Sequence, residues 1–283
     1  MKYTVIVNKD NPIKSNYINK INLVKTKNVL DEEILLEEET LNAYNELKKF
    51  LETKNIYIGI DEGYRSYEDQ EKLYNEFISE YGEEYTSKYL ALPGCSEHHI
   101  GLAIDLNIKI DGKYQTNNNE LEKYDNVFRI IHKHLYKFGF ILRYPKGKEN
   151  ITTFPYESWH IRYVGKVISK IIYDNKYTLE EYINNFSGVL LINKEKNMTS
   201  FDVIRKLINI FGIKKIGHTG TLDPLAEGVL VVVIGKALKI AELLTSTYKE
   251  YEAGVLLGTE TDTLDITGKI VKTKVYVDKG KLE

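Results

Sequence analysis

The stretch Ser96-Glu97-His98-His99-Ile100-Gly101-Leu102-Ala103-Ile104-Asp105-Leu106 decides the fold and the chemistry that we expect of this chain. From Gly101 to Ile108, apolar residues alternate with others at a period of two, which is typical of a half-buried strand. A fully extended chain would separate His98 from Asp105 by roughly 23 Å. Because glycine readily adopts turn conformations, we expect the chain to fold back at Gly101. The stretch therefore predicts His98 in a loop and Asp105 in the following strand, both directed at one point.

A second stretch, Glu157-Ser158-Trp159-His160-Ile161-Arg162-Tyr163, supplies another histidine and a spare carboxylate. On a flat strand Glu157 and His160 would face opposite ways, and Pro155 favours a bend that brings them together. Two imidazoles and one carboxylate are a common zinc ligand set, with a fourth position left for water. We therefore expect His98, Asp105 and His160 to bind Zn2+, and Glu157 to act as the base that takes the proton of that water. His132 and His134 are interpreted as surface or packing residues.

These motifs closely resemble those of the VanY-type D-alanyl-D-alanine carboxypeptidases, over about residues 30 to 186. The matching segments are Pro93 to His98, Gly101 to Asp105, Glu157 to Tyr163 and, upstream, Gly63-Tyr64-Arg65-Ser66-Tyr67 with Gln70. The resemblance implies a Hedgehog/D,D-peptidase-like zinc domain that trims the D-alanine end of peptidoglycan stem peptides. It also implies that Arg65 stabilises the tetrahedral oxyanion and that Ser96 contacts the substrate.

A glycine-rich loop from Gly217 to Gly228 precedes an expected buried strand, Val229 to Ile234. Taken alone, Asp223 before a proline in this loop is an ordinary turn former. However, the loop resembles the start of TruB, the bacterial tRNA pseudouridine-55 synthase, and four further segments of the chain share this resemblance. That resemblance implies that Asp223 is a catalytic carboxylate, that Tyr251 stacks on the target uracil and that His218 helps to hold the RNA. The further segments are Gly188 to Lys194, Met198 to Ser200, Lys249 to Tyr251 and Leu257 to Gly268.

The TruB-like part covers only about 96 residues, whereas TruB-like enzymes continue much further. They contain a later arginine that pairs with the catalytic aspartate, the rest of the central sheet and a C-terminal RNA-binding domain. An aspartate without that arginine has the wrong electrostatics for the reaction. We therefore expect pseudouridine formation by this chain to be weak or absent.

Composition places the chain among soluble globular proteins. Its 283 residues are 42% hydrophobic and 28% charged, and they suggest one large or two ordinary domains. We predict a zinc carboxypeptidase domain at residues 1–187 and a truncated synthase domain at residues 188–283. The formal charge of −2 does not indicate a nucleic-acid partner, although the second part is mildly basic and the first mildly acidic. A single cysteine excludes an internal disulfide and a cysteine-based zinc site.

The chain as written shows neither a secretory signal nor an 18-residue apolar stretch, so we expect no membrane span and a cytoplasmic protein. A signal upstream of Met1 would place it in the cell envelope instead. The expected partners are peptidoglycan stem peptides or wall fragments, and tRNA through the second part. Two alternatives stay open. In the first, the synthase activity defines the protein. In the second, residues 188–283 are a non-catalytic RNA- or protein-binding appendage.

Helices mixed with short strands, without regular alternation, predict an α+β fold. Expected helices cover residues 38–53, 124–138, 164–173 and 179–186, with two more that begin after caps at Ser66 and Ser200. Expected strands cover residues 3–7, 56–60, 140–144, 188–194 and 229–234, besides the strand from Gly101, and the tail 271–283 is strand-like. Expected loops cover residues 82–95, 111–119 and 146–153.

Overall fold

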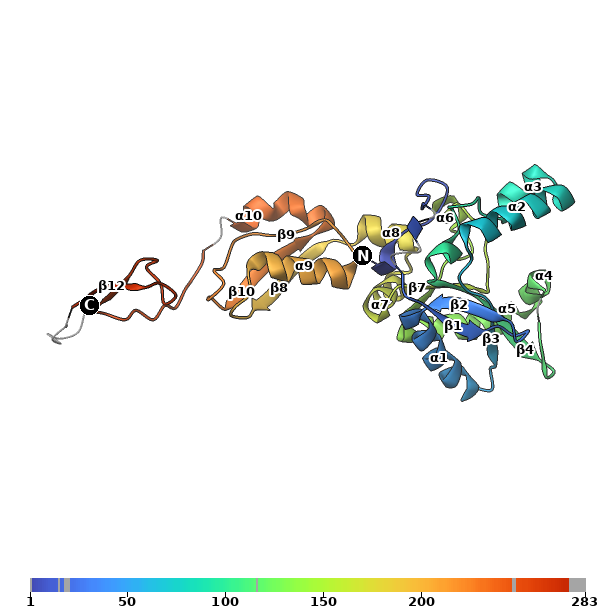
Figure 1. The fold of residues 1–283 in the computed structure, drawn as a ribbon, viewed down its shortest axis with the longest axis horizontal. Coiled ribbons are helices and arrows are strands. Elements are labelled where there is room, and N and C mark those ends of the chain that lie inside the picture. Colours follow the sequence, from blue (N-terminus) through green and yellow to red (C-terminus); the bar gives the residue numbers. More distant parts are fainter. Residues whose placement is uncertain (1, 15, 18–20, 116, 246–247, 275–283) are drawn as a thin grey trace. The chain divides into compact units, whose positions relative to one another are not determined.

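The structure is a computed structural model that describes residues 2–14, 16–17, 21–115, 117–245 and 248–274, and its fold is α+β as predicted (Figure 1). The chain divides into two compact units, Met1–Thr245 and Ser246–Glu283. The first unit contains all of the peptidase-like motifs and the start of the TruB-like segment. The second unit contains the remainder of that segment.

An antiparallel sheet forms the centre of the first unit, with strand order β3-β4-β7-β6. Its strands are β3 (Ile58–Glu62), β4 (Ala103–Ile110), β7 (His160–Tyr163) and β6 (Phe140–Leu142), and β5 (Lys113–Tyr114) extends it by pairing with β4. The predicted strand starts two residues later than expected. Polar and apolar residues alternate along this strand, but the strand is not half-buried as expected, because residues 103–108 are all buried.

Helix α1 (Glu38–Glu52) contributes to the main core, which also contains side chains of β3, β4 and β7. Tyr44, Leu47 and Leu51 recur at the spacing of one helical face and are buried. The helix follows a two-stranded hairpin of β1 (Leu23–Lys27) and β2 (Glu33–Glu37). The Glu37 side chain accepts a hydrogen bond from the backbone N–H of Thr40 and so caps the helix.

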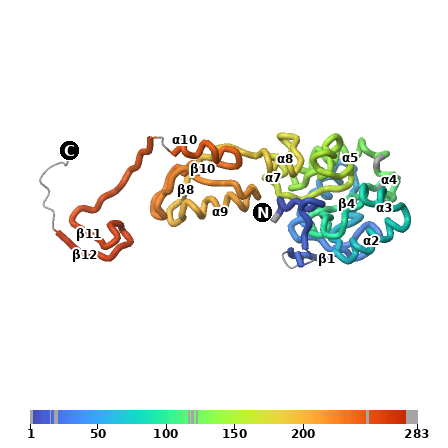
Figure 2. The backbone as a smooth tube through the Cα atoms, turned by 90° about the horizontal axis from the view of Figure 1, so that it is seen from above, coloured from blue at the N-terminus to red at the C-terminus, as the bar shows by residue number. Residues whose placement is uncertain are grey.

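The predicted strand at residues 3–7 is wrong. Residues Lys2–Thr4 form a short 3-10 helix, η1, and the carbonyl oxygens of Tyr3 and Val5 accept hydrogen bonds from the guanidinium of Arg162. A buried arginine therefore satisfies backbone groups that a neighbouring strand would otherwise pair. Both Figure 1 and Figure 2 place this N-terminal segment beside helix α9, where the Thr4 hydroxyl donates to the carbonyl of Gly212.

Helix α2 (Tyr67–Tyr81) begins at the predicted cap, because the Ser66 hydroxyl accepts from the backbone N–H of Asp69. The predicted loop at residues 82–95 is partly wrong, since it contains helix α3 (Glu83–Tyr89). Gly82, at φ 85°, changes the direction of the chain between the two helices, and only glycine adopts that backbone region readily. The aromatic residues on the two sides of Gly82 nevertheless keep a four-residue spacing along the sequence, from Phe77 to Tyr89.

The remaining predicted helices and strands of the peptidase-like part agree with the structure to within a few residues, whereas the predicted loop at residues 146–153 is partly wrong, because it contains α6 (Glu149–Thr152). The predicted loop at residues 111–119 is partly wrong, because it contains β5 and the start of α4. The elements are η3 (Glu97–Ile100), α4 (Asn118–Leu121), η4 (Glu122–Tyr124), α5 (Asp125–Leu135), η5 (Tyr136–Phe138), α6 (Glu149–Thr152), α7 (Lys166–Asn175) and α8 (Leu179–Asn185).

The TruB-like segment begins with a three-stranded antiparallel sheet of order β8-β10-β9. Thr199, not Ser200, caps its helix α9, through a reciprocal capping box with Asp202, and Gly212 ends that helix in a left-handed conformation. The elements are β8 (Gly188–Lys194), α9 (Ser200–Phe211), β9 (Ile216–His218), β10 (Gly228–Ile234), η6 (Gly235–Ile240) and α10 (Ala241–Thr245).

A second hydrophobic core crosses the domain boundary that we predict at residue 187. Side chains of α7 and α8 pack there with those of α9 and β10, and the Tyr182 hydroxyl donates to the carbonyl of Phe211. The buried members are Ile141, Val164, Ile168, Ile172, Leu179, Tyr182, Val203, Ile204, Leu207, Ile213, Leu230, Val232 and Ile234. The start of the TruB-like segment is thus a packing partner of the peptidase-like part.

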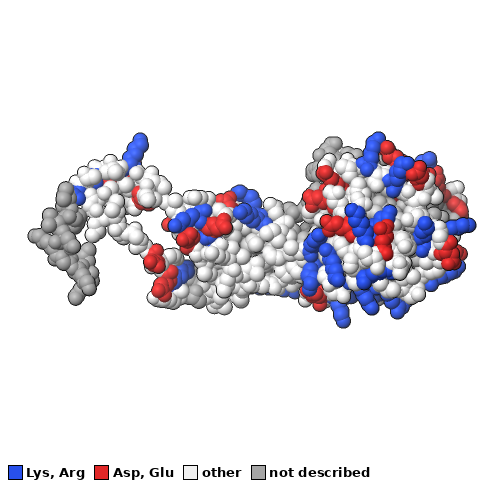
Figure 3. Space-filling model, turned by 90° about the horizontal axis from the view of Figure 1, so that it is seen from below, with Lys and Arg blue, Asp and Glu red and all other residues white. Residues whose placement is uncertain are grey.

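In the second unit, β11 (Thr259–Thr261) pairs with β12 (Ile270–Thr273), which covers the start of the predicted strand-like tail. Residues 275–283 of that tail lie outside the described residues. Across the described parts of both units, each helix is too short or too polar to cross a membrane. On the face drawn in Figure 3, basic and acidic side chains are interspersed.

We predict that Ile204→Ala destabilises the peptidase-like part, although Ile204 belongs to the TruB-like segment. Ile204 is 3% exposed in the second core, and truncating a buried isoleucine costs about 2–5 kcal/mol. Denaturant unfolding followed by the fluorescence of Trp159, the only tryptophan, reports on the peptidase-like part.

The matched control is Ile210→Ala on the same helix, where the side chain is 48% exposed and little stability is lost. An unchanged Trp159 midpoint in Ile204→Ala would show that the two parts unfold independently.

Candidate metal centre and catalytic site

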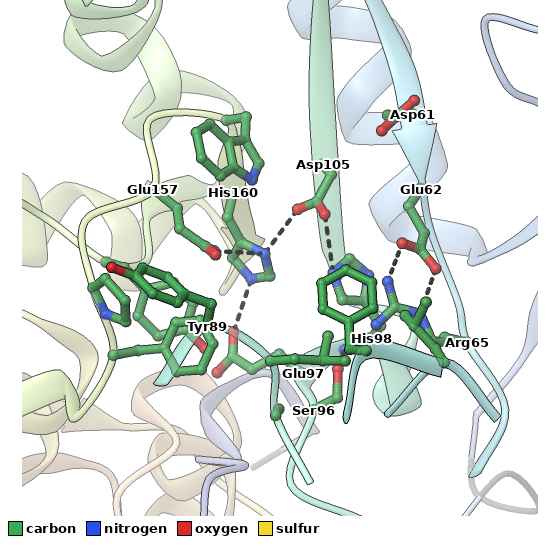
Figure 4. Close-up of a pocket in the computed structure, with 18 of the residues that line it drawn as sticks. Asp61, Glu62, Arg65, Tyr89, Ser96, Glu97, His98, Asp105, Glu157 and His160 are labelled. Carbon is green, nitrogen blue, oxygen red and sulfur yellow. Dashed lines mark hydrogen bonds and ion pairs between the residues drawn. The ribbon is translucent and has the colours of Figure 1, made fainter. Parts of the chain in front are cut away.

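The side chains of His98, Asp105 and His160 converge, as the sequence predicts (Figure 4). One ligand atom from each lies within 4.8 Å of the other two. Asp105 on β4 pairs directly with His160 on β7, and the Asp105 Oδ1 atom lies 2.8 Å from His160 Nδ1. The Asp105 Oδ2 atom lies 3.5 Å from His98 Nε2. One aspartate therefore faces both imidazoles.

His98 reaches this point because the chain folds back at Gly101, as predicted. The histidine lies in the short 3-10 helix η3, and not in an irregular loop, and Gly101 ends that helix at φ 65°. The Ser96 hydroxyl accepts from the backbone N–H of His98 and caps the helix. The His98 Nδ1 atom lies 2.6 Å from the carbonyl oxygen of Gly63. A proton on Nδ1 satisfies that carbonyl and leaves the Nε2 lone pair directed at Asp105.

His160 and Glu157 approach each other through a bend at residues 158–159, which confirms the predicted break in the chain. The Glu157 Oε2 atom lies 3.7 Å from His160 Nδ1. Burial would lower the pKa of His160, but the charge and hydrogen bond of Asp105 outweigh burial and raise that pKa to about 10. Burial would likewise raise the pKa of Asp105, but the facing His98 and His160 lower it well below its ordinary value.

The pKa of Glu157 is raised, whereas that of Asp105 is lowered. Burial raises the pKa of the Glu157 carboxyl to about 8, with the Asp105 charge adding to the effect and His160 opposing it. Burial also raises the pKa of Asp61, which lines the same cavity, to about 6. A carboxyl group whose pKa lies near neutrality is suited to take and return a proton.

The cavity at this site has a volume of about 580 Å³ and is lined by Arg65 and Ser96 besides the three convergent ligands and Glu157. Among the described lining residues, Arg65 alone carries a permanent positive charge. Its guanidinium donates to both carboxylate oxygens of Glu62 and to the side chain of Gln70. Arg65 follows the end of β3, as predicted from the sequence.

Sequence reasoning assigned no role to the buried charges beneath the ligands. Glu97 is fully enclosed, and one of its carboxylate oxygens accepts hydrogen bonds from Arg143 Nε and Arg162 Nη1, each at 2.7 Å. Burial would raise the pKa of Glu97, but the two guanidinium groups lower it far below its ordinary value. The position of Glu97 next to His98 in the sequence is the one local signal of a role at the site. Its arginine partners lie 46 and 65 residues away, so the sequence gives no sign of these contacts.

The other histidines of this part make structural contacts. The His99 ring lies between the carbonyl of Arg65 and the backbone N–H of Gly94. His132 Nε2 lies 2.8 Å from the carbonyl oxygen of Ser158, which supports its interpretation as a packing residue. His134 packs edge-on against Phe50.

The three residues predicted for the synthase reaction fall in two units. Asp223 is exposed in the loop before β10, and among the described residues it makes no ion pair. His218 lies on β9, and its buried Nδ1 atom has no hydrogen-bond partner within the described part of the chain. Tyr251 belongs to the second unit, where its side chain is 66% exposed. Their roles stay predictions.

Comparison with known proteins identifies two families. The VanY family model, D-alanyl-D-alanine carboxypeptidase, matches residues 33–166, and the N-terminal domain model of the TruB family pseudouridylate synthases matches residues 208–283. The chain is 35% identical over 179 residues to the bifunctional D-Ala-D-Ala dipeptidase and D-Ala-D-Ala carboxypeptidase VanXYC of Enterococcus gallinarum, which covers 62% of this chain and 91% of VanXYC.

Two further relatives match over a smaller share of their length. YodJ of Bacillus subtilis (strain 168) is 42% identical over 127 residues, and this match covers 45% of each chain. The tRNA pseudouridine synthase B of Fusobacterium nucleatum subsp. nucleatum is 54% identical over 97 residues, 34% of each chain. The chain therefore spans less than half of YodJ and about a third of that synthase.

Solved structures of the first family share the fold. VanYB in complex with D-Alanine-D-Alanine superposes with a TM-score of 0.54 at 30% identity, over 65% of this chain and 99% of that chain. A mutant of the vancomycin-resistance D,D-pentapeptidase VanY in complex with Zn(II) gives the same TM-score and identity, over 65% of this chain and 100% of that chain.

We predict that metal-free Glu157→Gln is more stable than the metal-free wild type at pH 8 and equally stable at pH 4. The folded wild type holds the Glu157 proton up to a pKa of about 8, whereas the unfolded chain releases it near 4.5. Ionisation therefore favours unfolding as the pH rises from 4.5 to 8, and glutamine removes this effect.

Thermal unfolding in the presence of a chelator, repeated across this pH range, measures the difference. Glu46→Gln, at an exposed position, serves as the control and follows the wild type throughout. A Glu157→Gln curve that also runs parallel to the wild type would contradict the predicted shift.

Proposed function

Because the chain belongs to the VanY family of D-alanyl-D-alanine carboxypeptidases, we propose that it is a zinc-dependent carboxypeptidase that removes a C-terminal D-alanine from peptidoglycan stem peptides. The observation that carries this proposal is the convergence of His98, Asp105 and His160 beside the unligated carboxyl of Glu157. The ligands come from separate parts of the chain, and they meet in the wall of one cavity.

The donor atoms fit zinc. Zn2+ in hydrolytic enzymes takes three protein ligands from histidine and carboxylate, in a tetrahedral arrangement with one open position. His98 Nε2, one Asp105 oxygen and His160 Nδ1 are the atoms that would hold it, since they face one another across the site. When bound, the ion acts as a Lewis acid and lowers the pKa of a water to about 7.

Glu157 is the residue that moves the proton in this proposal. It takes a proton from the attacking water and returns it to the amine that leaves as D-alanine. Its buried carboxyl lies beside His160 without occupying the ligand positions, and its raised pKa suits both steps. A nearby cation lowers that pKa and favours the form that accepts a proton.

Arg65 and Ser96 have binding roles in this proposal. Arg65 brings the permanent positive charge of the cavity lining and stabilises the oxyanion that develops on the scissile carbonyl. Its pairing with Glu62 and Gln70 holds the guanidinium in place. Ser96 caps the helix that carries His98 and contacts the substrate from the same wall.

The cavity extends beyond the metal ligands along a row of aromatic side chains, here called the aromatic row. Its members are Phe77, Tyr81, Tyr85 and Tyr89, spaced four residues apart on α2 and α3, with neighbouring ring centroids 4.6 to 5.3 Å apart. All four line the cavity, and the three tyrosines remain 41 to 50% exposed. We propose that the row binds the apolar face of the sugar attached to the stem peptide, because exposed rings offer flat apolar surfaces at low conformational cost.

We propose no catalytic role for residues 188–283. The exposed Asp223 makes no ion pair among the described residues, and a carboxylate without a cationic partner lacks the electrostatics that we expect of a synthase site. The buried side chains of α9 and β10 support a packing role instead.

Release of D-alanine from a stem pentapeptide is expected to require zinc and Glu157. A chelator abolishes the release and added zinc restores it, whereas Glu157→Gln binds zinc normally but loses about 100- to 10,000-fold in kcat. Amino-acid analysis of the product, with metal content by mass spectrometry, makes both measurements.

Glu76→Gln, on the exposed part of α2, is the control that keeps full activity. Substrates ending in D-Ala after either a D- or an L-centre identify the bond that is cut. A chelator-resistant release, or a fully active Glu157→Gln, would disprove the proposed mechanism.

For the aromatic row, Tyr81→Ala combined with Tyr85→Ala should raise KM for a muramyl-pentapeptide by about tenfold, since each lost ring contact is worth roughly 0.5–1.5 kcal/mol. The KM for the sugar-free pentapeptide should stay the same, because the sugar alone contacts the row. Steady-state kinetics on the two substrates measure the difference.

Tyr57→Ala is the matched control, because Tyr57 is 46% exposed and is not among the residues that line the cavity. Equal effects of the double variant on both substrates would place the sugar elsewhere.

A further inference from the structure

Two buried polar atoms face each other behind the metal ligands. The Glu97 Oε2 atom and the His160 Nε2 atom lie 3.7 Å apart, and neither has a hydrogen-bond partner among the described residues. Buried polar atoms are rarely left without a partner, so such a pair calls for a physical reason. Figure 4 shows Glu97 on the side of the His160 ring opposite Asp105 and Glu157.

The geometry assigns the two nitrogens of His160 to different partners. Nδ1 faces Asp105 and Glu157, on the side of the metal ligands, whereas Nε2 faces Glu97. A histidine that binds a metal through one nitrogen carries its proton on the other, and a carboxylate or carbonyl commonly accepts that proton. For His98 the carbonyl of Gly63 occupies this position. For His160 the corresponding group is Glu97.

Glu97 is itself held in place by charge. Its other carboxylate oxygen accepts from Arg143 and Arg162, and Arg143 also binds both carboxylate oxygens of Glu180 on α8. Because a guanidinium stays protonated in a protein, the two arginines hold Glu97 in its anionic form. The unpartnered oxygen is therefore fixed beside His160 as a full hydrogen-bond acceptor.

We propose, building on the metal site of the proposed function, that Glu97 is a positioning residue that accepts the Nε2 proton of His160 and keeps the Nδ1 lone pair directed at the metal. The carboxylate selects the tautomer that binds metal, because the alternative tautomer would place an Nε2 lone pair against an anion. The two arginines fix the carboxylate, and backbone carbonyls of the N-terminal segment hold Arg162 in place.

Glu97→Gln tests this inference because it keeps the shape of the side chain. While the amide oxygen faces the arginines, the amide N–H group faces His160 and favours the tautomer with the proton on Nδ1, which cannot bind metal. We expect the zinc affinity, measured by competition with a chromophoric chelator, to fall about 10- to 100-fold.

The matched control is Glu180→Gln, at the far end of the same buried charge cluster, where Arg143 loses an anionic partner but His160 is untouched. We expect its zinc affinity to stay within about threefold of the wild type. An equal loss in both variants would overturn the inference, because the loss would then come from disturbing the charge cluster. Wild-type affinity in Glu97→Gln would overturn it too.

A second measurement needs no variant. In zinc-loaded wild-type protein with 15N-labelled histidine, NMR should detect a proton on the Nε2 atom of His160 and zinc on Nδ1. A proton on Nδ1 would overturn the inference even if Glu97→Gln fails to fold. Failure of wild-type protein to bind zinc would overturn the proposed function together with the inference, whereas tight wild-type binding with the other tautomer would overturn the inference alone.

Discussion

The antiparallel pairing of β4 with β7 is the constraint on which the site depends. It sets Asp105 directly opposite His160, and side chains that face each other across two such strands lie about 5 Å apart. A shift of one residue in register would turn His160 to the other face of the sheet and separate the two ligands. The turn at Gly101 and the carbonyl of Gly63 then add His98 to this pair.

Charge is distributed around the ligands in two layers. Toward the cavity, Asp61, Asp105 and Glu157 bring three carboxyl groups together, and a divalent cation is the natural partner for such a set. Behind the ligands, Glu97 is neutralised by two buried arginines. Buried ion pairs of this kind contribute little net stability, but removing one member is strongly destabilising. We therefore expect the cluster to favour one arrangement of the ligands.

The TruB-like segment enters this structure as packing surface. Buried side chains of α9 and β10 complete a core whose other half comes from α7 and α8 of the peptidase-like part. The other face of the β8–β10 sheet carries exposed apolar side chains, including Val189, Leu191 and Val229. For the start of this segment the contacts show packing against the peptidase-like part, whereas the roles implied by the family resemblance stay predictions.

The sequence by itself determined the features that depend on near neighbours. These include the turn at Gly101, the strand that carries Asp105, the cap at Ser66 and the identity of the three ligands, because backbone preference, polarity pattern and ligand chemistry are local properties. Local composition also misled: residues 3–7 predict a short strand, but a distant arginine takes the carbonyls that a strand would pair.

Only the tertiary structure decided which nitrogen of each histidine faces Asp105 and which group lies beside the other nitrogen. Those contacts join residues 35 to 65 positions apart, such as Gly63 with His98 and Glu97 with Arg162. No period or spacing in the sequence encodes them, because they arise from strand register and from the packing of helices that are assembled only when the whole unit folds.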